Sequence, residues 1–190
     1  MKSPSLLLLL LALATGAIAS PHARLHTELG VIEVELVADK APATVTNFLK
    51  YVEAGRYTGG QFHRTVTHDN QPNNTVKIEV LQGGVNPQFA EKDWPAIALE
   101  RTRDTGLKHL DGTISMARAE PDTATSDFFL CIGDQPELDF GGKRNSDGQG
   151  FAAFGRVTKG LEIVKKIQSA PADGQKLTPP IRILKIEHLP

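Results

Sequence analysis

Residues 24–37 alternate between apolar and polar side chains, which is the two-residue period of a β-strand with one buried face. Ile32, Val34 and Leu36 fall on one face of this stretch, and the glutamates between them fall on the other. Gly30 interrupts the alternation, as a turn residue does. The segment therefore predicts a β-hairpin.

Two other segments show the longer period of an amphipathic helix. Pro42 begins a stretch whose apolar residues are spaced three and four positions apart, at Val45, Phe48, Leu49 and Val52. On a helix this spacing forms one apolar stripe, and proline is well tolerated in the first turn. Residues 161–168 place isoleucines and a valine on one side and lysines on the other. We expect one helix from Pro42 to about Gly55 and a second over 161–168.

The remaining regular structure is predicted to be short strands bounded by Gly, Asp, Asn or Pro. The candidates are residues 62–66, 77–81, 112–117, 128–132, 151–157 and 181–188. Many short strands with few helices favour an antiparallel sandwich or barrel, because a parallel sheet needs a crossover helix after nearly every strand. The pattern leaves open whether the sheet closes on itself. Because the chain has no internal repeat and no linker beyond its start, we expect one folded domain.

The first 19 residues differ from the rest of the chain. Lys2 precedes an apolar block at 6–13, and small residues at 17 and 19 flank Ile18 as at a cleavage site. This order is typical of a secretory signal peptide, and the block is far shorter than the roughly 20 residues of a membrane-spanning helix. We predict a signal peptide over 1–19 and a folded domain over 20–190, exported to a periplasm or secreted, with no membrane span in the mature chain. An uncleaved anchor is the alternative.

Charge and cysteine content narrow the classes of function. Lys and Arg total 21 against 22 Asp and Glu, which gives a formal net charge of −1. A near-neutral chain has no general electrostatic attraction to nucleic acid, so no nucleic-acid partner is expected. Cys131 is the single cysteine and lies in an apolar run. We expect a buried thiol there, with a reactive nucleophile as the alternative.

Five short motifs follow one another along the chain: FHR at 62–64, LQGG at 81–84, GTISMAR at 112–118, SDFFL at 126–130 and FGRV at 154–157. In this order they resemble the cyclophilins, which are peptidyl-prolyl cis-trans isomerases, and in particular the bacterial exported branch. The resemblance implies a mainly β fold, a closed eight-stranded antiparallel β-barrel capped by two α-helices. It also implies an outer groove for Xaa-Pro segments of unfolded or exported polypeptides. We expect a monomer that needs no cofactor.

The reaction of such a groove makes and breaks no covalent bond. Amide resonance opposes rotation about the Xaa-Pro bond with a barrier of about 18–20 kcal/mol, and the twisted state gives the proline nitrogen a lone pair. A fixed donor aimed at that nitrogen stabilises the twisted state more than the planar one. Arg64 matches the family's catalytic arginine, and a guanidinium suits the task because it is always charged. A surface arginine on a strand is the alternative.

The resemblance also implies substrate-binding roles. Gln82 would contact the substrate backbone, while Ala117 and Arg118 would hold the residue before proline. Phe129 would form the floor of the proline pocket. Other positions of the set surround it, namely Val80, Asp127, Leu138 and Phe151. Plain core packing is the alternative for the two phenylalanines and the leucine.

Three departures from the family pattern bear on this site. Asp127 replaces a glutamine and Glu137 replaces a tryptophan, so we expect additional negative charge and a preference for positively charged substrates. An insert over 67–79 lengthens the chain before Gln82. At its end, Glu79 and Val80 stand where the family has large apolar residues, so we expect a thinned or remodelled pocket wall.

Other functions have less support in the residues. His63 and His68 lack a third ligand for zinc, so no metal is expected. The glycine-rich run 141–150 lacks the strand and helix that flank a phosphate loop. The rival that remains is a cyclophilin-like module that holds proline-containing loops with little turnover, which Asp127, Glu137 and the insert favour. Acceleration of Xaa-Pro exchange would distinguish the enzyme from the module.

Overall fold

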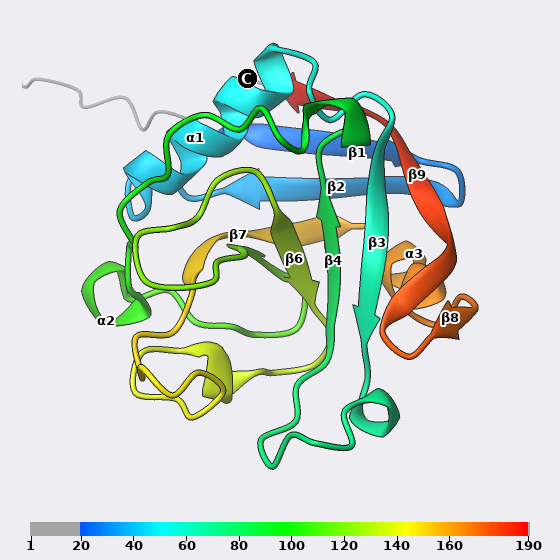
Figure 1. The fold of residues 1–190 in the computed structure, drawn as a ribbon. Helices are drawn as coiled ribbons and strands as arrows, with labels where there is room; N and C mark the ends of the chain where they lie inside the picture. Colours follow the sequence, from blue (N-terminus) through cyan, green and yellow to red (C-terminus); the bar gives the residue numbers. More distant parts are fainter. Residues whose placement is uncertain (1–19, 190) are drawn as a thin grey trace, which may run out of the picture.

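The structure is a computed structural model that describes residues 20–189, so the predicted signal peptide over 1–19 lies outside the described residues. Its strands are β1 (His22–Thr27), β2 (Gly30–Leu36), β3 (Gly60–Val66), β4 (Val80–Gly84), β5 (Thr113–Met116), β6 (Phe128–Cys131), β7 (Ala152–Lys159), β8 (Ala172–Asp173) and β9 (Lys176–Leu189). Eight of them form one antiparallel barrel in the order β1-β2-β7-β5-β6-β4-β3-β9, and β1 pairs with β9 to close it (Figure 1). The short β8 only pairs with the start of β9. The predicted closed barrel is confirmed.

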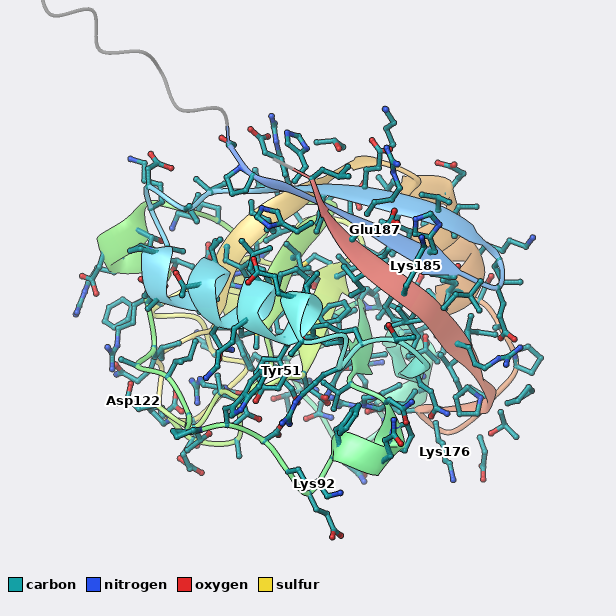
Figure 2. All side chains as sticks on the ribbon, turned by 90° about the horizontal axis from the view of Figure 1, so that it is seen from above. Tyr51, Lys92, Asp122, Lys176, Lys185 and Glu187 are labelled. Atoms are coloured by element: carbon teal, nitrogen blue, oxygen red, sulfur yellow. The ribbon has the colours of Figure 1, made fainter. Side chains whose placement is uncertain are left out.

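Two helices pack against the barrel, as the apolar spacing predicted. They are α1 (Pro42–Glu53) and α3 (Leu161–Gln168), and a single further turn forms α2 (Thr102–Thr105). Figure 2, seen from above, shows α1 lying across the barrel beside β9, which carries Lys185 and Glu187. None of the helices in the described part of the chain combines the length and the apolar character that a membrane crossing requires.

The start of α1 is stabilised by a residue far along the chain. The carboxylate of Glu100 accepts hydrogen bonds from the backbone N–H groups of Ala43 and Thr44 at 3.0 and 2.8 Å, and from the Thr44 hydroxyl at 2.6 Å. The first turn of a helix exposes unpaired N–H groups and the positive end of its dipole, so a carboxylate there is favourable. This contact fixes the connection between β4 and α2 against α1.

Alternation along β6 divides its side chains between two hydrophobic clusters. Phe128 faces the barrel interior, where its ring meets those of Phe48, Tyr57 and Phe62 edge-on with centroids 5.6 to 5.9 Å apart. Phe129 faces outward and belongs to a smaller cluster with Val66, Ile78, Val80, Cys131 and Leu138. The Cys131 thiol is fully buried, as predicted, and burial raises its pKa, so it stays protonated.

The fourth strand starts later than the sequence pattern predicted. The pattern gave 77–81, whereas β4 spans Val80–Gly84. Ile78 bonds through its backbone to the side chain of Gln71 instead of to a neighbouring strand. At the other end the strand continues through Gly83 and Gly84. Position 84 requires glycine because a Cβ there would overlap the Asp127 carboxylate. Glycine usually marks the end of a strand pattern, which explains the error.

Candidate active site

A pocket of about 730 Å³ lies on the outer face of the barrel, where β3, β4 and β6 are neighbours. The strand register places Arg64 opposite Gln82, and Gln82 opposite Phe129. The structure brings together all nine side chains that the sequence predicted for the site, since each lines this pocket: Arg64, Val80, Gln82, Ala117, Arg118, Asp127, Phe129, Leu138 and Phe151. Their roles toward substrate stay predictions.

The floor of the pocket is apolar and tightly packed. Phe129 is 4% exposed, and its ring meets that of Phe151 edge-on with centroids 5.3 Å apart. Val80 and Leu138 pack in the same cluster. A proline ring placed here would be surrounded by apolar side chains and would lose its hydration, which stabilises binding.

A hydrogen-bonded row of polar side chains supports this floor from behind. His109 stacks on Phe129 with centroids 6.0 Å apart. Its Nδ1–H donates to the Asp139 carboxylate oxygen Oδ1 at 2.8 Å, and its Nε2 shares a hydrogen bond with Ser115 Oγ at 3.0 Å. These are the residue types of a serine hydrolase triad. Ser115 is fully buried, however, so no substrate carbonyl reaches its hydroxyl. The row therefore fixes the position of the Phe129 ring.

Arg64 forms one wall of the pocket, and its guanidinium is held by two neutral side chains. Nη1 donates to Gln82 Oε1 at 2.9 Å, while Nε and Nη2 donate to Gln175 Oε1 at 2.9 and 2.7 Å. No carboxylate of residues 20–189 forms an ion pair with it. Burial lowers the pKa of Arg64, yet a guanidinium keeps its proton at any ordinary pH. The pocket thus has a positive charge that no counter-ion neutralises.

The chemistry of its two neighbours fixes the orientation of the Gln82 amide. Arg64 can only donate, so it faces the amide oxygen, and the Asp127 carboxylate accepts from Nε2 at 2.9 Å. His63 Nε2 lies 3.5 Å from the same carboxylate oxygen. Burial raises the pKa of Asp127, while the hydrogen bond from Gln82 and the charge of His63 act in the opposite direction. One continuous chain of contacts runs from Asp127 through Gln82 to Arg64.

Residues 22–188 match the family model of the cyclophilin type peptidyl-prolyl cis-trans isomerases, so the match includes every strand but the last residue of β9 and the whole pocket. This chain belongs to the cyclophilin family. It is therefore an enzyme, a peptidyl-prolyl cis-trans isomerase of the cyclophilin type.

Named relatives of this cyclophilin carry the same activity in their names. It is 37% identical over 161 residues to peptidyl-prolyl cis-trans isomerase A of Dickeya dadantii, which covers 84% of this chain and 77% of the relative. It is 35% identical over 144 residues to peptidyl-prolyl cis-trans isomerase B of Escherichia coli, covering 75% and 81%. The fold is similar to the crystal structure of a Cryptosporidium parvum cyclophilin, with a TM-score of 0.72 over 90% of this chain and 98% of that chain, at 23% identity.

Ala117 and Arg118, which were predicted to form the rim of the cyclophilin pocket, make different contacts. Ala117 donates its backbone N–H to the carbonyl oxygen of Asp127 at 2.9 Å. The Arg118 side chain is 1% exposed, pairs with Asp147 at 2.8 Å, and lies over the ring of Phe151 with 5.0 Å to the centroid. It also donates to the carbonyl oxygen of Gly150. Arg118 therefore holds the glycine-rich run against the pocket and presents little free charge to a substrate.

The insert over 67–79 contributes to the pocket wall, which we expected to be thinned or remodelled. Ile78 at its end lines the pocket, and the sequence gave it no role. Gln71 is 1% exposed and ties the insert together by donating to the carbonyl oxygens of Thr67 and Ile78 at 2.6 and 2.8 Å. The insert thus forms part of the pocket wall through Ile78.

Glu137 does not supply the second anion that we expected at the pocket. It is absent from the pocket lining, and its carboxylate accepts a hydrogen bond from the backbone N–H of Lys143 at 2.7 Å. Asp93, which the sequence gave no role, lines the pocket together with Asp127. Its carboxylate accepts from the Tyr51 hydroxyl, which Figure 2 shows on α1, at 3.1 Å.

The two histidines near the site serve different carboxylates. His63 approaches Asp127, whereas His68 lies 3.9 Å from Glu79. Within residues 20–189, no three His, Cys, Asp or Glu side chains come together in a group that could hold a metal ion.

Gln175 is a positioning residue that the sequence did not reveal. It lies in the turn between β8 and β9, 111 positions from Arg64, and it also donates from Nε2 to the carbonyl oxygen of Asn70 at 3.1 Å. Because Arg64 needs an acceptor and Asn70 offers one, the orientation of this amide is fixed as well. Gln175 thereby connects the arginine to the insert.

Two substitutions test this positioning role. Gln175→Ala removes two of the three hydrogen bonds of the guanidinium, so we expect kcat/KM for an Xaa-Pro peptide to fall about tenfold. Gln175→Glu keeps the acceptor but adds a counter-charge, so we expect at least as large a fall although the geometry is kept. Gln168→Ala, outside the pocket on α3, is the control. Full activity in Gln175→Glu would show that the free charge of Arg64 is unimportant.

Proposed function

We propose that this cyclophilin rotates Xaa-Pro bonds of exported polypeptides during their folding, with Arg64 donating to the proline nitrogen in the twisted transition state. The observation that carries the proposal is the Arg64 guanidinium, which two amide oxygens hold at the edge of an apolar floor and which has no counter-ion. Three of its five N–H groups are used within the protein, so two are available to a substrate.

The proposed mechanism divides the substrate between a fixed part and a rotating part. The proline ring packs on Phe129 and its apolar neighbours, and the carbonyl before it turns about the C–N bond. In the planar amide the nitrogen is a poor acceptor because its lone pair is delocalised, whereas the twisted amide accepts from Arg64. The bond therefore forms mainly in the transition state, and only such differential binding accelerates a reaction.

The required acceleration is within reach of this geometry. Uncatalysed Xaa-Pro exchange takes tens to hundreds of seconds, and reaching the millisecond range is about 10⁴-fold, or about 5–6 kcal/mol. A preorganised donor to a developing charge supplies about 3–4 kcal/mol. Binding of the proline ring in the apolar pocket and of the substrate backbone at Gln82 can supply the rest of this free energy by holding the substrate in position.

A kinetic assay with short peptides tests the proposed activity. The relaxation of an Xaa-Pro peptide from its cis to its trans form is followed with and without residues 20–190 of the protein. We expect catalysis at micromolar enzyme. Binding of the peptide without acceleration would contradict the proposal and would favour the rival peptide-binding module.

Export is the part of the proposal that rests on residues 1–19. Their charged start, apolar block and small-residue site are the support, and a periplasmic or secreted location follows from them. The test is to express the full chain in bacteria, separate periplasm, medium and cytoplasm, and determine the N-terminus. We expect a mature form that begins at Ser20 outside the cytoplasm. A full-length chain confined to the cytoplasm would refute export.

Asp127 should favour substrates with positive charge on the residues before proline. Its side chain is 38% exposed, and it lies beside Ala117, whose position is predicted to hold the preceding residue. Asp127→Gln keeps an acceptor for Gln82 and removes the charge. We expect the ratio of kcat/KM for Lys over Gln before the Xaa-Pro pair to fall about twofold to fivefold. Glu162→Gln, an exposed change on α3, is the control with the same charge difference. An unchanged ratio in Asp127→Gln would refute this role.

A further inference from the structure

A third arginine, besides Arg64 and Arg118, lines the pocket from a connection that the family motifs do not include. Arg144 lies in the β6–β7 connection, residues 132–151, inside the glycine-rich run. Its Nη1 donates to Gln71 Oε1 at 2.9 Å and to the carbonyl oxygen of Val76 at 2.7 Å, and both partners belong to the insert. Its backbone N–H donates to the carbonyl oxygen of Glu137 at 3.2 Å. The guanidinium is thus fixed where the connection meets the insert.

The charge of Arg144 is not neutralised within the part of the chain that the structure describes. Five other arginines there pair with carboxylates, at Arg24, Arg103, Arg118, Arg156 and Arg182, whereas Arg144 bonds only to neutral oxygens. Burial lowers the pKa of Arg144, and the charge of Arg64 adds to this effect. Arg64 and Arg144 therefore line the same pocket, and neither is paired directly with a carboxylate among residues 20–189.

Part of the Arg144 guanidinium remains available to a ligand. Both side-chain hydrogen bonds of Arg144 start from Nη1, so Nε and Nη2 have no protein partner among residues 20–189. No buried side-chain nitrogen or oxygen in that part of the chain lacks a partner, so these two atoms reach solvent. Nε and Nη2 are the pair that forms a parallel, two-bond contact with a carboxylate.

Contacts along β4 place Arg144 toward one end of the pocket and Asp127 toward the other. The line from Arg64 through Gln82 to Phe129 crosses the middle. Asp127 lies against Gly84, at the end of β4. Arg144 bonds to Val76, which lies before β4 begins, and Ile78 lines the pocket on that side. The pocket is therefore negative at the Gly84 end and positive at the Ile78 end.

We propose that Arg144 forms an anion subsite that selects peptides with an acidic residue shortly after the proline. The inference rests on the proposed function, which gives the placement of the substrate. In that placement the residue before proline lies near Ala117 and Asp127, and the proline ring packs on Phe129. The chain that follows the proline then runs toward Ile78 and Arg144. Ile78 offers apolar surface to the stem of a Glu side chain, and the guanidinium offers its two free donors to the carboxylate.

The test uses three peptides that differ only at the residue after proline, which is Glu, Gln or Lys. Exchange is followed by NMR, because a coupling protease would add its own preference. For the wild-type protein we expect kcat/KM to be about fivefold higher for Glu than for Gln, and lower for Lys than for Gln. The Glu preference should shrink when the salt concentration is raised from about 0.02 to about 0.5 M.

Variants assign the preference to one side chain. Arg144→Gln should reduce the Glu-to-Gln ratio to about one. Lys143→Gln makes the same change in charge at the adjacent, exposed position outside the pocket and should keep the wild-type ratio. Arg144→Lys retains the positive charge but not the planar guanidinium that can form two parallel hydrogen bonds, so an intermediate Glu-to-Gln ratio is expected. The salt dependence of the Glu preference is measured on the wild-type protein. It therefore tests the subsite even if Arg144→Gln loosens the β6–β7 connection.

The outcomes separate this inference from the function on which it rests. Equal rates for the three peptides in the wild-type protein would overturn the anion subsite and leave the isomerase intact. A Glu preference that survives in Arg144→Gln, or that is lost equally in Lys143→Gln, would overturn the assignment to Arg144. No acceleration of any of the three peptides would instead refute the proposed function.

Discussion

Replacing Arg64 with alanine is expected to lower kcat/KM for an Xaa-Pro peptide by about 10²–10³-fold, the usual cost of removing one preorganised donor to a transition state. The substitution removes the only donor that the account places at the proline nitrogen, while the apolar floor and the substrate contacts of Gln82 remain. Peptide binding should therefore change much less than the rate. The measurement is kcat/KM for the variant and the wild-type protein, together with the peptide Kd.

Controls for Arg64→Ala separate chemistry from folding. The guanidinium is only half-buried and forms no ion pair among residues 20–189, so its removal should change the free energy of unfolding by about 1 kcal/mol or less. Arg64→Lys keeps the charge but cannot bond to Gln82 and Gln175 together, so intermediate activity is expected. Arg103→Ala makes the same charge change on α2, outside the pocket, and should have wild-type activity. Unchanged turnover in Arg64→Ala would remove the proposed mechanism.

Phe128 and Phe129 are adjacent in sequence, and their replacement by alanine should impair different properties, stability for Phe128 and activity for Phe129. Phe128 is fully buried among the aromatic rings of the barrel interior. Phe128→Ala leaves a closed cavity, so we expect a loss of about 3–5 kcal/mol in the free energy of unfolding. That corresponds to a Tm lower by roughly 10 °C in a domain of this size. Activity measured well below the Tm should be reduced less than stability.

Phe129→Ala should mainly reduce activity. Its ring forms the floor of the outer pocket, and the space left by its removal opens to water, so the stability cost should be smaller than for Phe128→Ala. Burial of one apolar side chain contributes about 1.5–3 kcal/mol, so loss of the floor should lower kcat/KM about 10- to 100-fold. Thermal unfolding and kcat/KM of the two variants, measured side by side, check the contrast. A larger stability loss in Phe129→Ala would contradict the two-cluster description.

Local periodicity predicted the two longer helices and most strands because these elements depend on nearby residues, but it gave no sign of the single turn α2. The helix over 161–168 was predicted to the residue, and the hairpin at Gly30 was located correctly. Closure of the barrel joins β1 to β9, which are more than 150 positions apart, so no local pattern contains it. The family resemblance supplied that part. The start of β4 was misplaced because Gln71, a side chain outside the strand, satisfies the backbone of Ile78.

The same division holds for the pocket. Its strand residues belong to sequence motifs and were predicted to share one cleft. Gln175 and Arg144 were missed because each comes from a turn that only the closed barrel brings to the pocket. Glu137 was expected to be an anion of the pocket because the family position implied it, but the β6–β7 connection gives its carboxylate a backbone N–H to bind, that of Lys143.

NMR exchange spectroscopy of an Xaa-Pro peptide, with a small fraction of wild-type protein or of Arg64→Ala, tests the central claim most directly. It reports rotation about the bond itself at equilibrium, and titration of the same sample reports binding. With the wild-type protein we expect cis-trans exchange peaks at mixing times of about 0.1 s, whereas uncatalysed exchange takes tens of seconds. With Arg64→Ala we expect binding of similar strength and no such peaks. Exchange peaks of equal intensity with both proteins would contradict the account.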